Sequence, residues 1–118
     1  MKHLKLFENI EDSIPYKDGK VKDPEKRGYI AYRRYDDGVW VMMGSYTNPE
    51  NRGEGVFKTL FAKLMDKIQP GETIQAAATS KILASYLQRR YNFHKIKHPV
   101  RHWGRIANGV SLELTKEN

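Results

Sequence analysis

The chain contains no cysteine among its 118 residues. This absence excludes disulfide bonds, metal sites that use thiolates, and catalysis by a thiol nucleophile. The chain also lacks long apolar runs. Residues 1–8 hold no apolar stretch long enough for a signal peptide, and no later run could span a bilayer. These absences together predict a cytoplasmic protein with no membrane partner.

Acidic residues are in short supply. The chain has 14 Asp and Glu against 21 Lys and Arg, for a net charge of +7 and a sequence pI of about 9.6. Such a balance attracts anionic partners, and nucleic acid, an acidic protein and a polyphosphate cofactor all fit it. The length and the apolar share of 39% indicate a single folded domain over residues 1–118, with one core.

The first quarter of the chain is weakly patterned. Leu4 and Leu6 fit one edge strand, whereas Asp18-Gly19-Lys20 and Asp23-Pro24 are turn signals that predict a charged loop. The pattern sharpens after Gly28. An aromatic-rich run at 29–35 and an apolar run at 39–43 flank Asp36-Asp37-Gly38, which predicts an antiparallel hairpin.

The middle of the chain predicts a strand, a helix and a second strand. Apolar residues recur every three or four positions from Val56 to Ile68, and Pro70-Gly71 ends that helix. A strand at 73–78 follows, which makes a βαβ unit with a parallel pair and a right-handed crossover. A second helix at 80–91 and strands around 93–97 and 110–114 complete a mixed sheet of the α/β class.

The turn between the apolar strand and the first helix carries the clearest functional signal. A helix start presents free backbone N–H groups and a positive dipole end, which suit a phosphate-like anion. The P-loop pattern fails because Phe57 and Arg52 stand where it needs glycine. The dinucleotide pattern fails at Lys58. A plain alternative is a tight turn that uses Gly53 and Gly55 for geometry alone.

The turn resembles the Arg/Gln-x-x-Gly-x-Gly/Ala signature of the GNAT superfamily of N-acetyltransferases. Phe57 replaces the last small residue of that signature. Ala84, Leu87 and Tyr91-Asn92-Phe93 are similar to the family's second motif, with Asn92 in place of glycine. The resemblance implies a GNAT-like fold, here with a reduced N-terminal region: a central mixed β-sheet with a βαβ acyl-CoA-binding core and helices on both faces.

The resemblance also implies a function. A GNAT enzyme binds acetyl-CoA and moves its acetyl group to a primary amine by direct attack. The acceptor here would be a small molecule, a protein or an aminoacyl group. The pantetheine arm would pair with the end of the preceding strand at Ser45, Tyr46 and Thr47. The pyrophosphate would lie on the backbone amides of the turn, at Arg52, Gly53, Glu54, Gly55, Val56 and Phe57.

Catalytic residues are harder to place. The family often uses a tyrosine as general acid at the position of Gln88, so Tyr86 is the first substitute and Tyr91 the second. The strand at 39–47 carries no Asp or Glu that could serve as a general base. Glu72, Glu113 and His102 are remote from it, and no base is assigned.

The segment 94–105 is the most basic of the chain. Its histidines are spaced four apart, but Pro99 breaks a helix there, so no metal site is expected. Its cations and Trp103 suit nucleic-acid phosphates and bases. An alternative function is therefore a catalytically weak or inactive GNAT-fold module that binds nucleic acid or another anionic partner through this region. Both a monomer and a homodimer are compatible with the sequence.

Overall fold

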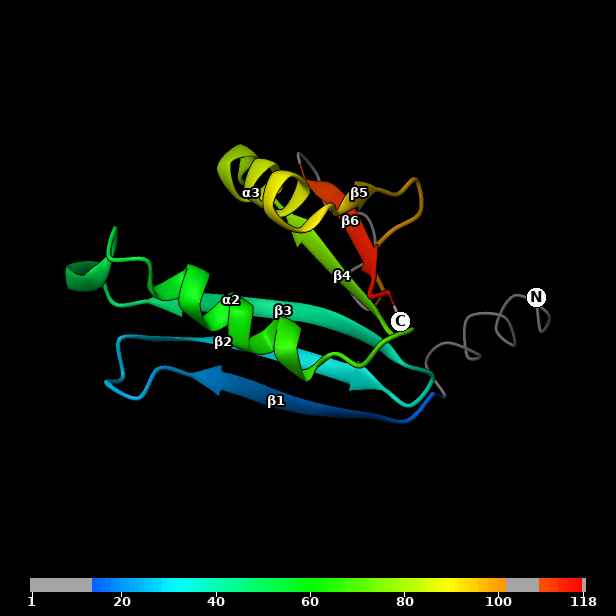
Figure 1. Ribbon diagram of the computed structural model, residues 1–118, viewed down its shortest axis with the longest axis horizontal. Helices are drawn as coiled ribbons and strands as arrows, with labels where there is room; N and C mark the ends of the chain where they lie inside the picture. Colours follow the sequence, from blue (N-terminus) through cyan, green and yellow to red (C-terminus); the bar gives the residue numbers. More distant parts are fainter. Residues whose placement is uncertain (1–13, 102–108, 118) are drawn as a thin grey trace, which may run out of the picture.

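The computed structural model describes residues 14–101 and 109–117. The strand predicted at Leu4 and Leu6, and the roles considered for His102 and Trp103, lie outside these residues. Within them, a mixed sheet of order β1-β2-β3-β4-β6-β5 carries two α-helices (Figure 1). The elements are β1 Tyr16–Lys22, β2 Gly28–Tyr35, β3 Val39–Thr47, the 3-10 helix η1 Pro49–Asn51, α2 Val56–Lys67, β4 Thr73–Ala78, α3 Lys81–Tyr91, β5 His94–Lys95 and β6 Val110–Thr115.

Strand β1 occupies the segment for which a charged loop was predicted, so that prediction is wrong. The sequence indicates a turn at Asp18 and Gly19, but these residues pair with Arg33 and Tyr32 of the neighbouring strand β2. The Asp18 carboxylate accepts a hydrogen bond of 2.7 Å from Arg33 Nε. A Cβ at position 19 would lie 2.5 Å from the Tyr32 hydroxyl. Glycine is needed here because an aromatic ring lies over it, not because the chain turns.

The predicted hairpin is confirmed as β2 and β3, with a turn after Tyr35 and Gly38 at φ +87°. Strand β3 runs four residues further than the apolar pattern indicated, to Thr47. The register shifts beside Ala31, so that Ala31 pairs with Gly44 and Tyr32 with Met42. The extra residue, Met43, forms a β-bulge that changes which face of the sheet the following side chains occupy.

Both predicted helices are confirmed. Helix α2 buries the apolar stripe found in the sequence and packs on β2 and β3. Helix α3 begins at its cap Ser80, whose hydroxyl accepts a hydrogen bond from Leu83 N at 3.3 Å. It ends at Asn92, which takes the left-handed conformation at φ 64° that asparagine tolerates.

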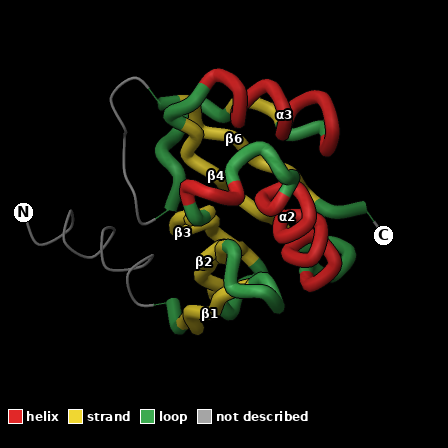
Figure 2. Tube along the Cα trace, turned by 90° about the vertical axis from the view of Figure 1, so that its left-hand side faces the viewer, coloured by secondary structure: helices red, strands yellow, loops and turns green. Residues whose placement is uncertain are grey.

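The described helices lie on one face of the sheet, whereas the sequence predicted helices on both faces (Figure 2). The reason is that α2 and α3 pack against each other through aromatic rings. The Phe61 and Tyr91 centroids are 5.0 Å apart, and those of Phe57 and Tyr86 are 6.4 Å apart. On the opposite face, within the described residues, Val41 packs with Tyr35 and Val100.

The chain after α3 forms the far edge of the sheet. Strand β6 inserts between β4 and β5 and is antiparallel to both. Strand β5 has two residues, fewer than the predicted 93–97. Between them, Arg101 N donates to Gln75 Oε1 at 2.9 Å, and the Arg101 side chain pairs with Asp37. No helix within the described ranges is long and apolar enough to cross a membrane.

Candidate functional site

Strands β3 and β4 run parallel but separate along their length. They pair from Val39 with Thr73 to Val41 with Gln75, and no further pair joins them. Figure 1 shows the two strands diverging from this closed end. In the part of the chain that the structure describes, β3 therefore has an edge without a strand partner from residue 42 to 47.

The register shows which backbone groups face the open edge. Asn48 N donates to Arg27 O at 2.7 Å, so this pair is hydrogen-bonded across β2 and β3. Bonded and non-bonded pairs alternate in an antiparallel ladder, which turns the Tyr46 backbone toward β2. The N–H and C=O groups of Ser45 and Thr47 consequently face the open side, where they can pair with an extended ligand.

The glycine turn has the conformation that its sequence suggested. Gly53 has φ +88° and Gly55 has φ +79°, a region in which residues with a Cβ are strained. A Cβ at either position would meet no atom within 4 Å. Space is therefore not the constraint, and backbone conformation alone explains both glycines.

The start of α2 presents unpaired donors. Gly55 is its N-cap and offers no side-chain oxygen, and the first turn holds no acidic residue. Thr59 N is the first helical amide with an acceptor, Gly55 O at 3.1 Å. Among the described residues, the amides of Val56, Phe57 and Lys58 have no hydrogen-bond acceptor. An anion at this point would satisfy them and the positive end of the helix dipole.

A cavity of about 700 Å³ joins the glycine turn, the open end of β3 and the start of α3. None of its lining residues is acidic, and Arg52 and Lys58 bring positive charge. Neither cation has an ion-pair partner among the described residues. Eight of the predicted site residues line this cavity: Ser45, Thr47, Arg52, Gly53, Gly55, Val56, Phe57 and Tyr86.

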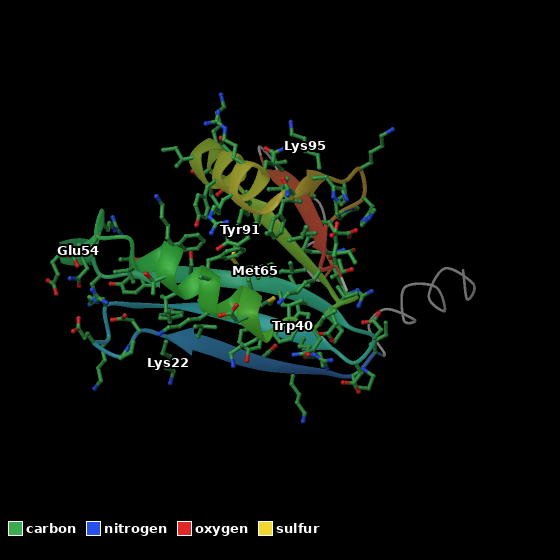
Figure 3. The ribbon with its side chains drawn as sticks, viewed as in Figure 1. Lys22, Trp40, Glu54, Met65, Tyr91 and Lys95 are labelled. Atoms are coloured by element: carbon green, nitrogen blue, oxygen red, sulfur yellow. The ribbon has the colours of Figure 1, made fainter. Side chains whose placement is uncertain are left out.

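Three predicted site residues lie outside the cavity. The Tyr46 ring is on the opposite face of β3, where it packs against Tyr29 at 5.9 Å. Glu54 points away from α2 (Figure 3), and its carboxylate accepts a hydrogen bond of 3.1 Å from Asn51 Nδ2. Tyr91 lies between α2 and α3, where its ring packs on Phe61.

The cavity also contains residues that the sequence did not single out. Asn51 and Lys58 flank the glycine turn, and Ser80, Ile82 and Leu83 come from the first turn of α3. A signal for Ser80 was available, since serine before an amphipathic segment is a helix N-cap. Ile82 carried no such signal. Its exposure of 83% becomes informative only once the fold places it at the mouth of the cavity.

Tyr86 is the ionisable hydroxyl of the cavity wall. Its ring packs edge-on against Phe57, and Lys58 Nζ lies 5.5 Å from its centroid. Burial raises the pKa of Tyr86, and the neighbouring Tyr91 raises it further. The phenol is therefore protonated at neutral pH and can donate a hydrogen bond or a proton. Gln88, two residues further along α3, does not line the cavity.

The remote carboxylates are engaged elsewhere. Glu72 accepts hydrogen bonds from Trp40 Nε1 and Arg34, at the closed end of the strand pair. Glu113 accepts one from Gln75 Nε2 at 2.9 Å. In the described ranges, no group of histidine and acidic side chains could hold a metal ion.

No model of a known protein family matches the sequence, and no curated protein matches it. Solved structures do match the fold. One is a Corynebacterium glutamicum protein described as "histone acetyltransferase HPA2 and related acetyltransferase", with a TM-score of 0.64 and 18% identity. The match covers 96% of this chain and 73% of that one.

Two further matches carry the same kind of description. An acetyltransferase of the GNAT family from Staphylococcus aureus has a TM-score of 0.53 and 18% identity, with 89% of this chain and 73% of that chain covered. The ribosomal-protein-S18-alanine N-acetyltransferase of Escherichia coli has a TM-score of 0.56 and 14% identity, with 90% and 72% covered. At this identity the likeness concerns the fold, and the chain has the fold of the GNAT superfamily of N-acetyltransferases.

Proposed function

We propose that the protein is an N-acetyltransferase that moves the acetyl group of acetyl-CoA to a primary amine by direct attack. The observation that carries this proposal is the combination of the open β3 edge with the unpaired amides at the start of α2. Both border one cavity that contains no carboxylate. A ligand with an extended amide-bearing arm and a diphosphate matches these two features at once.

In this arrangement the pyrophosphate accepts hydrogen bonds from the amides of Gly55, Val56 and Phe57. Arg52 and Lys58 add positive charge. The pantetheine amides pair with the open backbone groups of Ser45 and Thr47. The thioester then lies where β3 and β4 separate.

The chemistry needs a neutral amine and a proton for the departing thiolate. A lysine-type amine titrates near pH ~10.4, so its neutral form is scarce at pH 7. No carboxylate lines the cavity, so we assign proton removal to water rather than to a side chain. We assign protonation of the thiolate to Tyr86, because this residue lines the cavity and its phenol, whose pKa is raised by burial, is protonated at neutral pH.

The alternative is a GNAT-fold module without activity that binds nucleic acid through the basic C-terminal region. Two of the described residues in this basic region are unsuited to binding nucleic acid. Arg101 is held by Asp37 and lies over the Tyr35 ring at 4.7 Å, and Val100 is buried. Lys95, Lys97 and His98 are exposed and keep the alternative open to test.

Calorimetric titration with acetyl-CoA, CoA and acetyl-pantetheine tests the proposal. The account predicts micromolar dissociation constants for the first two ligands, and much weaker binding of acetyl-pantetheine, which lacks the nucleotide phosphates. A concentration of one hundred times the dissociation constant would stabilise the fold by about 2.7 kcal/mol. No heat and no thermal shift at millimolar acetyl-CoA would reject the acetyltransferase function.

Thiol release from acetyl-CoA then separates the enzyme from the module. The chain has no cysteine, so a thiol reagent has no background from the protein. A panel of small amines, peptides with free amino termini and aminoacyl esters serves as acceptors. Release that depends on an acceptor supports the enzyme. Binding of acetyl-CoA without release for any acceptor supports the module.

A further inference from the structure

The sheet has a second surface that the proposed function does not use. Strands β1 to β3 turn one face toward α2, where Val21 and Ile30 are buried. The alternate side chains point to the other side, which we call the outer face: Lys20, Lys22, Tyr29, Ala31, Gly44 and Tyr46. The strand register places them in two rows, Lys22–Tyr29–Tyr46 and Lys20–Ala31–Gly44.

Two tyrosines form an exposed aromatic pair in the first row. The Tyr29 and Tyr46 centroids are 5.9 Å apart with an angle of 31° between the rings. Tyr46 is 45% exposed, among the most exposed of the large apolar side chains in the described ranges. The core does not explain this ring, because the buried residues of β3 lie on the other half of the strand.

Lysines surround the aromatic pair. Lys20 Nζ lies 4.5 Å from the Tyr29 centroid, and Lys22 is the cross-strand neighbour of Tyr29. Lys26 belongs to the turn that follows β1 and takes a left-handed conformation, with φ +59°. Over the described part of the chain, these three lysines have no ion-pair partner.

Asp23 lines the same hollow as these lysines but is paired elsewhere. Asp23 accepts hydrogen bonds from Arg27 Nε at 2.8 Å and Arg27 Nη2 at 2.9 Å, and two backbone amides also donate to it. These bonds hold the pKa of Asp23 well below its usual range. Arg27 also lies 3.3 Å from Glu25 Oε2 and 3.9 Å from Glu54 Oε1. Among the described residues, these carboxylates pair with Arg27 and none forms an ion pair with Lys20, Lys22 or Lys26, so the three ammonium groups can bind a ligand.

The outer face is hollowed on both sides of Lys20. One hollow of about 240 Å³ lies among Lys20, Lys22, Lys26, Tyr29 and Tyr46. The next, of about 350 Å³, lies over Ala31 and is bounded by Met43 and by Asp18, whose carboxylate is paired with Arg33. A Cβ on Gly44 would meet no atom within 4 Å, so this floor is open. Adjacent rows are about 6.7 Å apart along the strands, so the hollows follow one another.

We propose that the outer face binds single-stranded nucleic acid, with bases stacked on Tyr46 and Tyr29 and phosphates held by Lys20, Lys22 and Lys26. Aromatic rings with interleaved cations on an open sheet are the arrangement that unstacked bases require. A duplex hides its base faces and would not use the rings. An acidic peptide would favour arginine forks over lysines and would also leave the rings unused.

This surface is separate from the cavity, and strands β1 to β3 lie at the opposite end of the sheet order from β5. Ser45 and Thr47 line the cavity on one side of β3, and Tyr46 lies on the other side. Nucleic-acid binding can therefore be measured without acetyl-CoA. Its failure would leave the acetyltransferase proposal unchanged, and the reverse also holds.

Fluorescence anisotropy with a labelled oligo-uridine probe of about ten nucleotides tests the proposal on the full chain. Tyr46→Ala should weaken binding by about 5- to 150-fold, the usual loss of one stacked base. Tyr46→Phe keeps the ring and should bind like the wild type. The exposed position of Tyr46 makes both variants compatible with folding, which thermal unfolding checks directly.

The lysines are tested by salt dependence between about 50 mM and about 200 mM. The double variant Lys20→Gln with Lys22→Gln should reduce the slope of log affinity against log salt by about 1.4. The matched control is Lys63→Gln with Lys67→Gln, which removes the same charge from exposed positions on α2. It should change affinity by less than about twofold.

Four results would overturn the proposal. One is no anisotropy change at protein concentrations up to about 100 µM in the lower salt. A second is an equal loss of affinity in the Lys20/Lys22 and Lys63/Lys67 double variants, which would show that net charge alone binds the probe. A third is a duplex that binds as tightly as the single strand. The last is an acidic peptide that displaces the probe and itself loses affinity in Tyr46→Ala.

Discussion

The two halves of strand β3 differ in how they are held. Residues 39–41 pair with β4, and Trp40 and Val41 also pair with β2 on the other side. From residue 42 onward the strand keeps β2, and its other edge borders the cavity. In the proposed function, stability and ligand binding are therefore assigned to different halves of this nine-residue strand. The closed half determines the angle at which β3 and β4 diverge, and the open half presents backbone groups to a ligand.

A partly buried carboxylate, that of Glu72, fixes the closed half. Glu72 Oε1 accepts hydrogen bonds from Trp40 Nε1 at 3.1 Å and Gln69 N at 2.9 Å, and Oε2 accepts one from Arg34. Burial acts to raise the pKa of Glu72, but these donors outweigh it and the pKa is lowered. The carboxylate stays ionised, and it links β2, β3 and the start of β4 at the point where the strands are closest.

The largest expected effect concerns the cavity wall beside the open half. Tyr86→Phe removes the hydroxyl that we propose protonates the thiolate and keeps the ring against Phe57, so kcat should fall by about 10²- to 10⁴-fold. Acetyl-CoA affinity should change little. Steady-state thiol release and calorimetry measure the two quantities. An unchanged kcat would remove Tyr86 from the mechanism, and Tyr91→Phe would then test the second candidate.

The closed half is tested by Glu72→Ala. This change leaves the Trp40 Nε1 and Gln69 N donors without their partner, so the free energy of unfolding should fall by about 1–3 kcal/mol. Urea unfolding measures it. Glu72→Gln keeps one acceptor oxygen and should lose less. If Glu72→Ala weakened acetyl-CoA binding and left stability unchanged, the separation of the two halves would be wrong.

The glycine turn is tested by Gly55→Ala. Alanine at φ +79° costs about 1–2 kcal/mol, so the turn should relax and acetyl-CoA binding should weaken by about 5- to 30-fold. The matched control is Gly44→Ala on β3, where a Cβ also meets open space but φ is not in the left-handed region. Equal affinity in the two variants would show that the conformation of the turn does not matter for binding.

The smallest expected effect concerns the turn between β1 and β2. The Arg27 hydrogen bonds lower the pKa of Asp23 in the folded state. Asp23 therefore stabilises the fold above its unfolded pKa of about 3.9, and this contribution is lost as the pH falls below that value. The stability difference between wild type and Asp23→Asn should shrink from about pH 5 toward about pH 2. A difference that stays constant over this range would contradict the lowered pKa.

The sequence predicted those elements whose signals are local. The hairpin, α2, β4 and α3 follow from periodicity and turn residues, and the glycine turn follows from residues that need a positive φ. It failed at β1, because Gly19 makes room for the Tyr32 ring and so depends on a partner strand. Within the described residues α2 and α3 share one face of the sheet, and the ring contacts between them become visible only in the fold.

The site was predicted in the same uneven way. Gly53 and Gly55 have positive φ angles, which glycine favours regardless of its neighbours, so the turn could be predicted from the sequence. The position of Tyr46 depends on the bulge at Met43, since one extra residue moves every later side chain to the other face. Ile82 enters the cavity only because α3 packs beside α2. Register and helix packing are long-range properties, and no local pattern encodes them.

The most direct test of the account is an amide chemical-shift titration of the labelled full chain with acetyl-CoA. The predicted result is that the largest shifts fall at Gly55, Val56, Phe57 and Lys58, with smaller ones at Ser45 and Thr47. Amides of β1 should not move. Shifts confined to other parts of the chain, or none at millimolar ligand, would contradict the claim that the open half of β3 and the start of α2 form the acetyl-CoA site.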